Sequence, residues 1–277
     1  LLNQQLNIGQ FVAAEIIIIT IINAVEKIII NLDSVYDVLT AVEKVSKLTD
    51  KPVESSGTYN MTQDSGVALE ARQLYYGYET GKHILKDLSF TIPPGSKVCI
   101  SGRDGAGKST LLKLLLGGYK DFTGTLTINN IPIGNYNLES VRQNTGILFA
   151  QENIFGGTLM DNISMGRTGL NTAYITKLVQ QVGLQPFLAS LPAGYDTELE
   201  PTGMRLPRNV VQKILLVRAL AHQPKLLVME EPWQNIEEPY ATQIQHLLLG
   251  LQDATVIVAT RNKTFASRCQ TNIQLTL

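Results

Sequence analysis

The residues with the clearest chemical potential lie in the stretch GRDGAGKST, from Gly102 to Thr110. They follow the spacing G-x-x-x-x-G-K-[ST], in which glycines let the backbone curl so that successive N–H groups point at phosphate oxygens. Lys108 is expected to reach the β- and γ-phosphates of a nucleotide, and the Ser109 hydroxyl is expected to bind Mg²⁺. The pattern predicts these nucleotide-binding residues: Gly102, Asp104, Gly105, Ala106, Gly107, Lys108, Ser109 and Thr110.

Two adjacent carboxylates form a second group with chemical potential. Glu230 and Glu231 follow the apolar run LLVM, which is typical of a buried strand. The carboxyl ends of strands are where α/β sheets bind ligands. We therefore expect the pair to lie near the ligand, whereas an isolated Glu-Glu pair would be interpreted as a solvated turn.

The elements that must position these residues are those of an α/β domain. Strand patterns cover ALEARQLYYGY, ILKDLSFTI and SKVCISG in the first half, and LLVME and TVIVAT in the second. The run KSTLLKLLLGG predicts a helix closed by glycine. The glycine-rich stretch thus lies between a strand and a helix, where phosphate binding requires it. We expect this domain to cover residues 68–277.

The N-terminal segment has a different character. Residues 11–30 are apolar apart from Glu15, Thr20, Asn23, Glu26 and Lys27. As a helix they would span about 30 Å, the thickness of a bilayer core. The segment therefore predicts a membrane-spanning helix in contact with lipid, with a buried helix of a soluble protein as the alternative. It lacks the basic region and the small-residue cleavage site of a signal peptide.

Charged residues further define this helix and its end. Glu15 and Glu26 are eleven positions apart, so they lie within about 20° of each other on a helix. This polar edge could face a protein interior or a wet cavity, or the two glutamates could lie near the two membrane interfaces. An amphipathic pattern continues the helix into water, giving a first region of residues 1–50. Residues 51–67 are expected to form a polar linker.

Bulk composition excludes several classes of function. The 277 residues carry 23 basic and 24 acidic side chains, so the charge balance gives no field for binding nucleic acid. Cys99 and Cys269 are too few for a disulfide framework or a cysteine-based metal site. The first residue is Leu, and the first residues have the character of an internal segment, so we expect the chain to be the C-terminal piece of a longer protein.

Taken together, these motifs resemble those of the ATP-binding cassette (ABC) transporter family, over nearly the whole chain. LYYGY places Tyr78 where the family stacks an aromatic ring on adenine, with a core tyrosine at a strand end as the alternative. FAQENIFGGTLMDNI resembles the Q-loop, although the spacing after Gln151 is one residue shorter than usual, and KLLVMEEP resembles the Walker B strand. The resemblance implies an α/β P-loop NTPase, with a RecA-like core, an antiparallel β subdomain and an α-helical subdomain, preceded by a long transmembrane and cytosolic helix.

The resemblance also implies roles for individual residues. Ser109, Gln151 and Glu230 would hold Mg²⁺, and Glu230 replaces the usual Asp at its position. Gln151 would also contact the attacking water. Glu231 stands at the position of the general base. The expected cofactors are ATP and Mg²⁺.

One segment departs from the family pattern. Where the family has L-S-G-G-Q, which caps the γ-phosphate bound to the opposite subunit, Pro207 lacks an N–H group, and Arg208 and Asn209 carry side chains in place of glycines. Asn209 can still cap the following helix. Arg208 could replace the lost amides by its charge or be an exposed loop residue. The divergent signature consists of Leu206, Pro207, Arg208, Asn209 and Val210.

Two further positions diverge. Arg261 replaces the switch histidine that contacts the γ-phosphate, and it is expected to hold ATP more than to assist turnover. The D-loop, usually S-A-L-D, reads QNIE at residues 234–237.

The resemblance thus predicts an ATP-binding exporter subunit with impaired or partner-dependent hydrolysis. It would be an integral membrane protein with its cassette on the cytoplasmic side. It would work with further transmembrane helices of the same protein and with a second cassette subunit, in a hetero- or homodimer. An ATP-binding regulatory or scaffold module without turnover is the alternative, while a P-loop kinase or GTPase does not explain the Q-loop segment or the apolar helix.

Overall fold

The computed structural model of the chain describes residues 7–51, 54, 56–62, 65–78, 82–201 and 205–276. It forms two compact units that divide after Ser55, and each is treated by itself below. Parts of the expected linker (52, 53, 55, 63 and 64) and residues 202–204, just before the divergent signature, lie outside the described residues.

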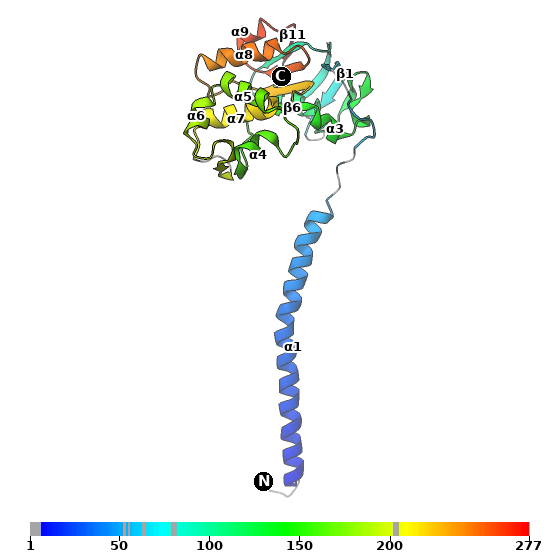
Figure 1. The fold of residues 1–277 in the computed structure, drawn as a ribbon. Helices are drawn as coiled ribbons and strands as arrows, with labels where there is room; N and C mark the ends of the chain where they lie inside the picture. Colours follow the sequence, from blue (N-terminus) through cyan, green and yellow to red (C-terminus); the bar gives the residue numbers. More distant parts are fainter. Residues whose placement is uncertain are drawn as a thin grey trace. The chain divides into compact units, whose positions relative to one another are not determined.

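The first unit consists of the single helix α1, Ile8–Thr49 (Figure 1). Asn7 caps its start, and Gln10 accepts a hydrogen bond from the Asn7 N–H at 3.0 Å. The helix ends where the Asp50 N–H bonds to the Ser46 carbonyl at 2.8 Å. Among the described residues, α1 is the one helix long and apolar enough to cross a membrane. The long N-terminal helix expected from the sequence is confirmed.

The second unit alternates short helices and strands, as predicted for an α/β domain. Its helices are α2 Lys108–Leu114, α3 Leu138–Gln143, α4 Leu159–Ser164, α5 Thr172–Gln181, α6 Gln185–Ser190, α7 Arg208–Leu220, α8 Tyr240–Gly250 and α9 Lys263–Ala266, with 3₁₀ turns at Ile133–Asn135 and Gly194–Asp196. Its strands are β1 Leu69–Tyr76, β2 Leu85–Ile92, β3 Lys97–Gly102, β4 Thr123–Ile128, β5 Ile131–Pro132, β6 Thr145–Leu148, β7 Gly157–Thr158, β8 Glu198–Leu199, β9 Leu226–Glu230, β10 Thr255–Ala259 and β11 Thr271–Leu275.

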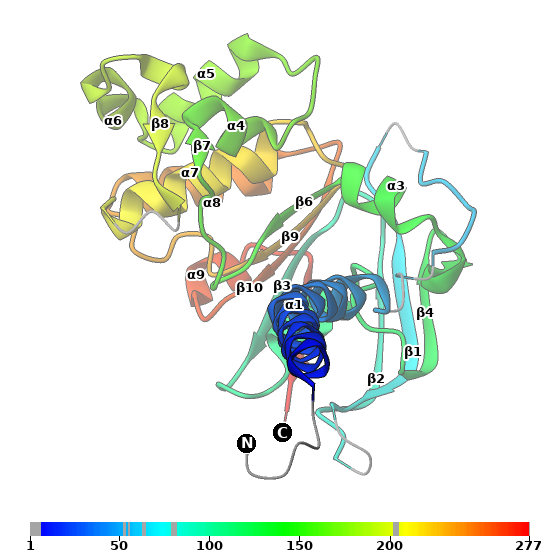
Figure 2. The same cartoon turned by 90° about the horizontal axis from the view of Figure 1, so that it is seen from below.

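Two main sheets organise this unit. An antiparallel sheet has the order β2-β1-β4-β5, and a parallel sheet has the order β11-β3-β10-β9-β6. Figure 2 shows the antiparallel strands at one side of the parallel sheet and the helices α4 to α7 gathered at the other. This division matches the core, antiparallel subdomain and helical subdomain that the family resemblance implied.

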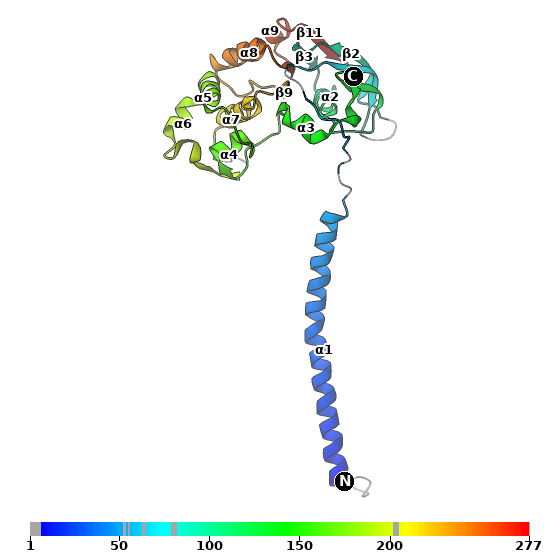
Figure 3. The same cartoon turned by 45° about the vertical axis from the view of Figure 1, so that its right-hand side comes forward.

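Helix α2 lies between the two sheets, where it carries the residues that follow the phosphate loop (Figure 3). Its side chains Leu111, Leu112 and Leu114 are fully buried, in one core with residues such as Leu126 of β4 and Val228 of β9. A second core joins the helical subdomain to the other face of the parallel sheet through α7, whose Ile214, Leu216 and Val217 are also fully buried. The parallel sheet is thus packed on one face by the core that contains α2 and on the other by the core that contains α7.

Part of the segment expected as a linker packs on the second unit. The Tyr59 N–H bonds to the Asn135 carbonyl at 3.0 Å, and the Met61 N–H bonds to the Ser140 hydroxyl at 2.9 Å. The Met61 side chain is buried. Residues 51–67 are therefore divided between the two units.

Candidate nucleotide-binding site

Three neighbouring strands of the parallel sheet bring the predicted chemistry together. In the sheet, Ala259 of β10 pairs with Glu230 of β9 on one side and with Ile100 of β3 on the other. Because the strands are parallel, the segments that follow them emerge at one edge. The phosphate loop after β3, Glu231 after β9 and Arg261 after β10 therefore meet there.

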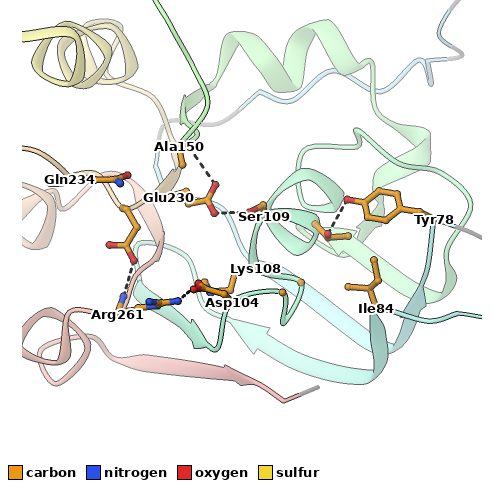
Figure 4. A pocket seen from close by; sticks show the side chains of 13 residues that line it. Tyr78, Ile84, Asp104, Lys108, Ser109, Ala150, Glu230, Gln234 and Arg261 are labelled. Carbon is orange, nitrogen blue, oxygen red and sulfur yellow. Dashed lines mark hydrogen bonds and ion pairs between the residues drawn. The ribbon is translucent and has the colours of Figure 1, made fainter. Parts of the chain in front are cut away.

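A cavity of about 780 Å³ opens at this edge (Figure 4). Ile84, Ala150 and Gln234 contribute to its wall, and the first two were not predicted from the sequence. In the described part of the chain, the predicted residues Gly102, Ala106 and Gln151 do not line it. The predicted site residues that do line it are Tyr78, Asp104, Gly105, Gly107, Lys108, Ser109, Thr110, Glu230, Glu231 and Arg261.

The phosphate loop has a backbone that requires glycine. Gly105 and Gly107 have φ angles of +80° and +90°, in the left-handed region that side chains disfavour. A Cβ atom on Gly107 would also lie 2.8 Å from the Ile84 Cγ2 atom. The Lys108 Nζ atom donates to the carbonyls of Gly102 and Arg103, at 3.0 and 2.9 Å. A loop curled around an ammonium group in this way fits a polyphosphate, which can replace those carbonyls as the acceptor.

The groups expected to hold Mg²⁺ are also adjacent. The Ser109 hydroxyl lies 2.5 Å from Oε1 of Glu230, and Oε2 of Glu230 accepts a 3.4 Å bond from the Ala150 N–H. A hydroxyl and a carboxylate are oxygen ligands of the kind that Mg²⁺ binds together with phosphates. The extra methylene of Glu230 thus leaves its carboxylate next to Ser109, and this donor set fits the ion.

Glu231 is fixed by the segment that follows β10. Its two carboxylate oxygens accept hydrogen bonds from the Thr260 hydroxyl at 2.8 Å and from the Arg261 N–H at 3.0 Å. Its own φ of +43° turns the chain sharply after β9. Thr260 is fully buried and was not expected to act in the site, although its place directly after a strand next to Arg261 is a signal that could have been used.

Arg261 and Asp104 face each other across the mouth of the cavity and form an ion pair. Their side chains are 59% and 85% exposed, so solvent weakens their attraction. The pair nevertheless joins the segment after β10 to the phosphate loop, a contact that the sequence did not predict.

Tyr78 lies two residues beyond β1 and is 56% exposed. Its phenol lies 3.0 Å from the Thr110 hydroxyl. This exposure argues against the alternative of a core tyrosine, whereas Tyr76 is buried, as expected for a packing residue. A flat aromatic face is therefore present beside the phosphate loop.

Gln151, predicted to bind Mg²⁺ and to contact the attacking water, does not line the cavity. It is exposed and comes directly after Ala150, whose N–H bonds to Glu230. The segment containing it thus contacts the site through the backbone of Ala150.

Comparison with known proteins agrees with this geometry. The family model described as ABC transporter matches residues 85–234, more than half of the chain. The chain belongs to the ABC transporter family.

Individual members of the ABC family show how much of such a protein this chain represents. It is 32% identical to an ATP-dependent lipid A-core flippase of Coxiella burnetii (strain RSA 493 / Nine Mile phase I), over 82% of this chain and 39% of that protein. It is 36% identical to the mitochondrial ATP-dependent permease MDL2 of Saccharomyces cerevisiae (strain ATCC 204508 / S288c), over 69% of this chain and 25% of that protein. Its fold matches a bacterial Atm1-family ABC exporter solved with ATP bound, with a TM-score of 0.77 and 26% identity over 86% of this chain and 42% of the other. The chain thus spans about two fifths or less of these relatives.

The residues predicted to form a divergent signature, Leu206 to Val210, lie away from the cavity, at the start of α7. Pro207 occupies the N-cap position and makes no side-chain cap bond, so the prediction that Asn209 caps this helix is wrong. Proline fixes φ near the value needed there, at −57°, and the helix begins at Arg208 before Asn209 is reached. In the described chain, none of the five residues Leu206 to Val210 lines the cavity.

Asn209 instead contacts Glu237, in the segment predicted to be the D-loop of the same chain. Its Nδ2 atom donates to Oε2 of Glu237 at 3.3 Å, while Lys213, one turn further along α7, forms an ion pair with the other oxygen of Glu237. The hydrogen bond from Lys213 lowers the pKa of Glu237. The start of α7 is thereby tied to residues 234–237.

Proposed function

We propose that this chain is the ATP-binding part of an ABC exporter subunit that hydrolyses ATP, with a rate that is limited by its own divergent signature. The observation that supports this most strongly is the convergence of Lys108, the Ser109–Glu230 pair and Glu231 on one cavity at the carboxyl edge of the parallel sheet.

In this proposal the cavity binds ATP along its length. The adenine lies on the exposed ring of Tyr78, and the phosphates lie in the loop that is now closed around the Lys108 ammonium. Ser109 and Glu230 would hold Mg²⁺ when it is bound. The ion, when bound, neutralises the charge that develops on the phosphate oxygens. Arg261 adds a charge at the same end.

Hydrolysis needs a base beside the γ-phosphate. We assign this role to Glu231, which would take a proton from the attacking water as the water oxygen bonds to the γ-phosphorus and the bond to ADP breaks. Thr260 and the Arg261 N–H orient its carboxylate. Gln151 would assist only if its segment moves toward the cavity, since it now lies exposed outside it.

The remaining parts of the proposal concern partners. Members of the family work as dimers of cassettes, and we propose that this chain pairs with a second cassette subunit, with its own damaged signature facing the partner's ATP. We also propose that residues 11–30 of α1 contact membrane lipid, alongside further transmembrane helices, with the cassette on the cytoplasmic side.

The test is ATP turnover by the detergent-solubilised chain beside its Glu231→Gln variant, with ATP binding titrated for both. We expect both proteins to bind ATP and only the first to release phosphate above background. Binding without any difference in turnover between them would contradict hydrolysis and favour an ATP-holding module.

A further inference from the structure

Three tyrosines form a closed cluster beside the cavity: Tyr76, Tyr78 and Tyr119, referred to here as the tyrosine cluster. The rings of Tyr76 and Tyr119 are stacked, with centroids 5.0 Å apart and planes 26° apart. The exposed ring of Tyr78 meets both of the others edge-on, at 5.4 and 5.5 Å. Each ring therefore contacts the other two, in the stacked and perpendicular arrangements that aromatic rings prefer.

The Tyr78 phenol is held at two points. It lies 3.0 Å from the Thr110 hydroxyl and 3.3 Å from the Tyr119 hydroxyl. The hydrogen bond with Tyr78 also raises the pKa of Tyr119 to about 12. Because Thr110 and Tyr119 belong to α2 and to the turn after it, the tyrosine cluster is attached to the segment that follows the phosphate loop.

The turn after α2 explains how Tyr119 reaches this place. Gly117 adopts a φ of +71°, and the Gly118 N–H bonds back to the Lys113 carbonyl at 2.9 Å. A Cβ atom on Gly117 would lie 2.6 Å from Leu138 Cδ2, so a larger residue would also require the Leu138 side chain to shift. The turn brings Tyr119 back beside the end of β1, where it packs, partly buried, on the core.

The exposed ring of Tyr78 thus has fixed neighbours on one side and the cavity on the other, where it lines the wall with Ile84. Without a neighbouring ring, an exposed tyrosine samples several rotamers and must be ordered when a ligand binds. Tyr119 limits that freedom before any ligand arrives.

We infer that Tyr119 is a positioning residue for base recognition, which holds Tyr78 in the orientation that receives the purine. This inference rests on the proposed function, because it assumes that ATP occupies the cavity. It states that Tyr119 affects the part of the affinity that comes from the base and leaves the part that comes from the phosphates unchanged.

Two ligands separate these parts: ATP, and inorganic tripolyphosphate, which has the phosphates without the base. Both are titrated with Mg²⁺ into the full chain in detergent. For Tyr119→Leu we expect the ATP Kd to rise about tenfold, within the range given by stacking of a base on an aromatic ring, and the tripolyphosphate Kd to stay within about twofold. Tyr119→Phe, which keeps the ring and loses the hydroxyl, is expected to show a smaller rise of the same kind. Phe122→Leu is the matched control, because Phe122 is also partly buried on this core, and it should change neither Kd.

A double-mutant comparison tests whether Tyr119 affects ATP binding through Tyr78. If Tyr119 acts through Tyr78, Tyr119→Leu should weaken ATP binding no further in a Tyr78→Leu background. Equal losses for ATP and tripolyphosphate, no loss for ATP, or additive losses in the double variant would each overturn the inference. Failure of the wild-type chain to bind either ligand would instead refute the proposed function, and the inference with it.

Discussion

The phosphate-loop cavity and the start of α7 both lie at the ends of well-packed elements, but their polar groups have different partners. In the cavity, Lys108 and Ser109 contact groups that a nucleotide and Mg²⁺ can replace or share. At the start of α7, Asn209 and Lys213 bind Glu237 of the same chain. The first region has the arrangement of a ligand site, whereas the polar groups of the second form contacts within the chain.

The largest effect that would sharpen this comparison is expected at Lys108. Lys108→Ala removes the cation at the centre of the phosphate loop, and we predict at least about a 100-fold loss of ATP affinity. Calorimetric titration measures it. Lys113→Ala, on the same helix but outside the cavity, should bind ATP as the wild type does. Equal behaviour of the two variants would show that the loop is not the site.

His222, which follows α7, should make the stability of the folded chain depend on pH. Burial, followed by the charge of Arg167, lowers the pKa of His222 to about 4, against about 6.5 in an unfolded chain. The unfolded chain therefore binds more protons between these values, so stability falls as the pH drops from 7 to 4, by about 3 kcal/mol. Urea unfolding at several pH values measures this. His222→Gln should flatten that part of the profile, and a fall of equal size in this variant would contradict the assignment.

Restoring the family signature should change turnover and leave binding unaltered. In the triple variant Pro207→Ser, Arg208→Gly, Asn209→Gly, the backbone regains its N–H group and its glycines, and we predict about a tenfold faster release of phosphate when copies associate. The ATP Kd should stay within about twofold, because these residues lie outside the cavity. A changed ATP Kd with an unchanged rate of phosphate release would mean that the start of α7 affects ATP binding and not turnover.

The smallest effect is expected at the ion pair between Asp104 and Arg261. Asp104→Asn removes a negative charge beside the phosphates and releases Arg261, so ATP affinity should rise about two- to threefold in low salt. The gain should shrink in high salt, because both side chains are exposed. A loss of affinity would mean that Asp104 helps to hold the nucleotide. A titration series in sodium chloride distinguishes these results.

The sequence was sufficient to predict the features that depend on residues close together in the chain. The glycine-rich stretch lies between β3 and α2, Glu230 ends a buried strand, and the apolar N-terminal run is one long helix. In each case the spacing of residue types already determines the backbone. The α/β class follows from the same patterns.

Contacts between segments that are distant in the sequence could not be predicted from such patterns. Asn209 is a good capping residue, but the N-cap position is occupied by Pro207. The Asn209 side chain instead donates a hydrogen bond to Glu237, which belongs to another loop. The exposure of Gln151 and the arrival of Tyr119 beside Tyr78 depend on how whole segments pack. These features need the tertiary structure because no residue near them in sequence signals them.

The most direct test of the central claim, that this chain binds ATP with its own cavity, is calorimetric titration of Mg²⁺-ATP into the full chain at several chain concentrations. The structure predicts one ATP per chain, with a Kd that does not depend on chain concentration and that rises at least about 100-fold in Lys108→Ala. Binding that appears only when chains associate, or an unchanged Kd in Lys108→Ala, would contradict it.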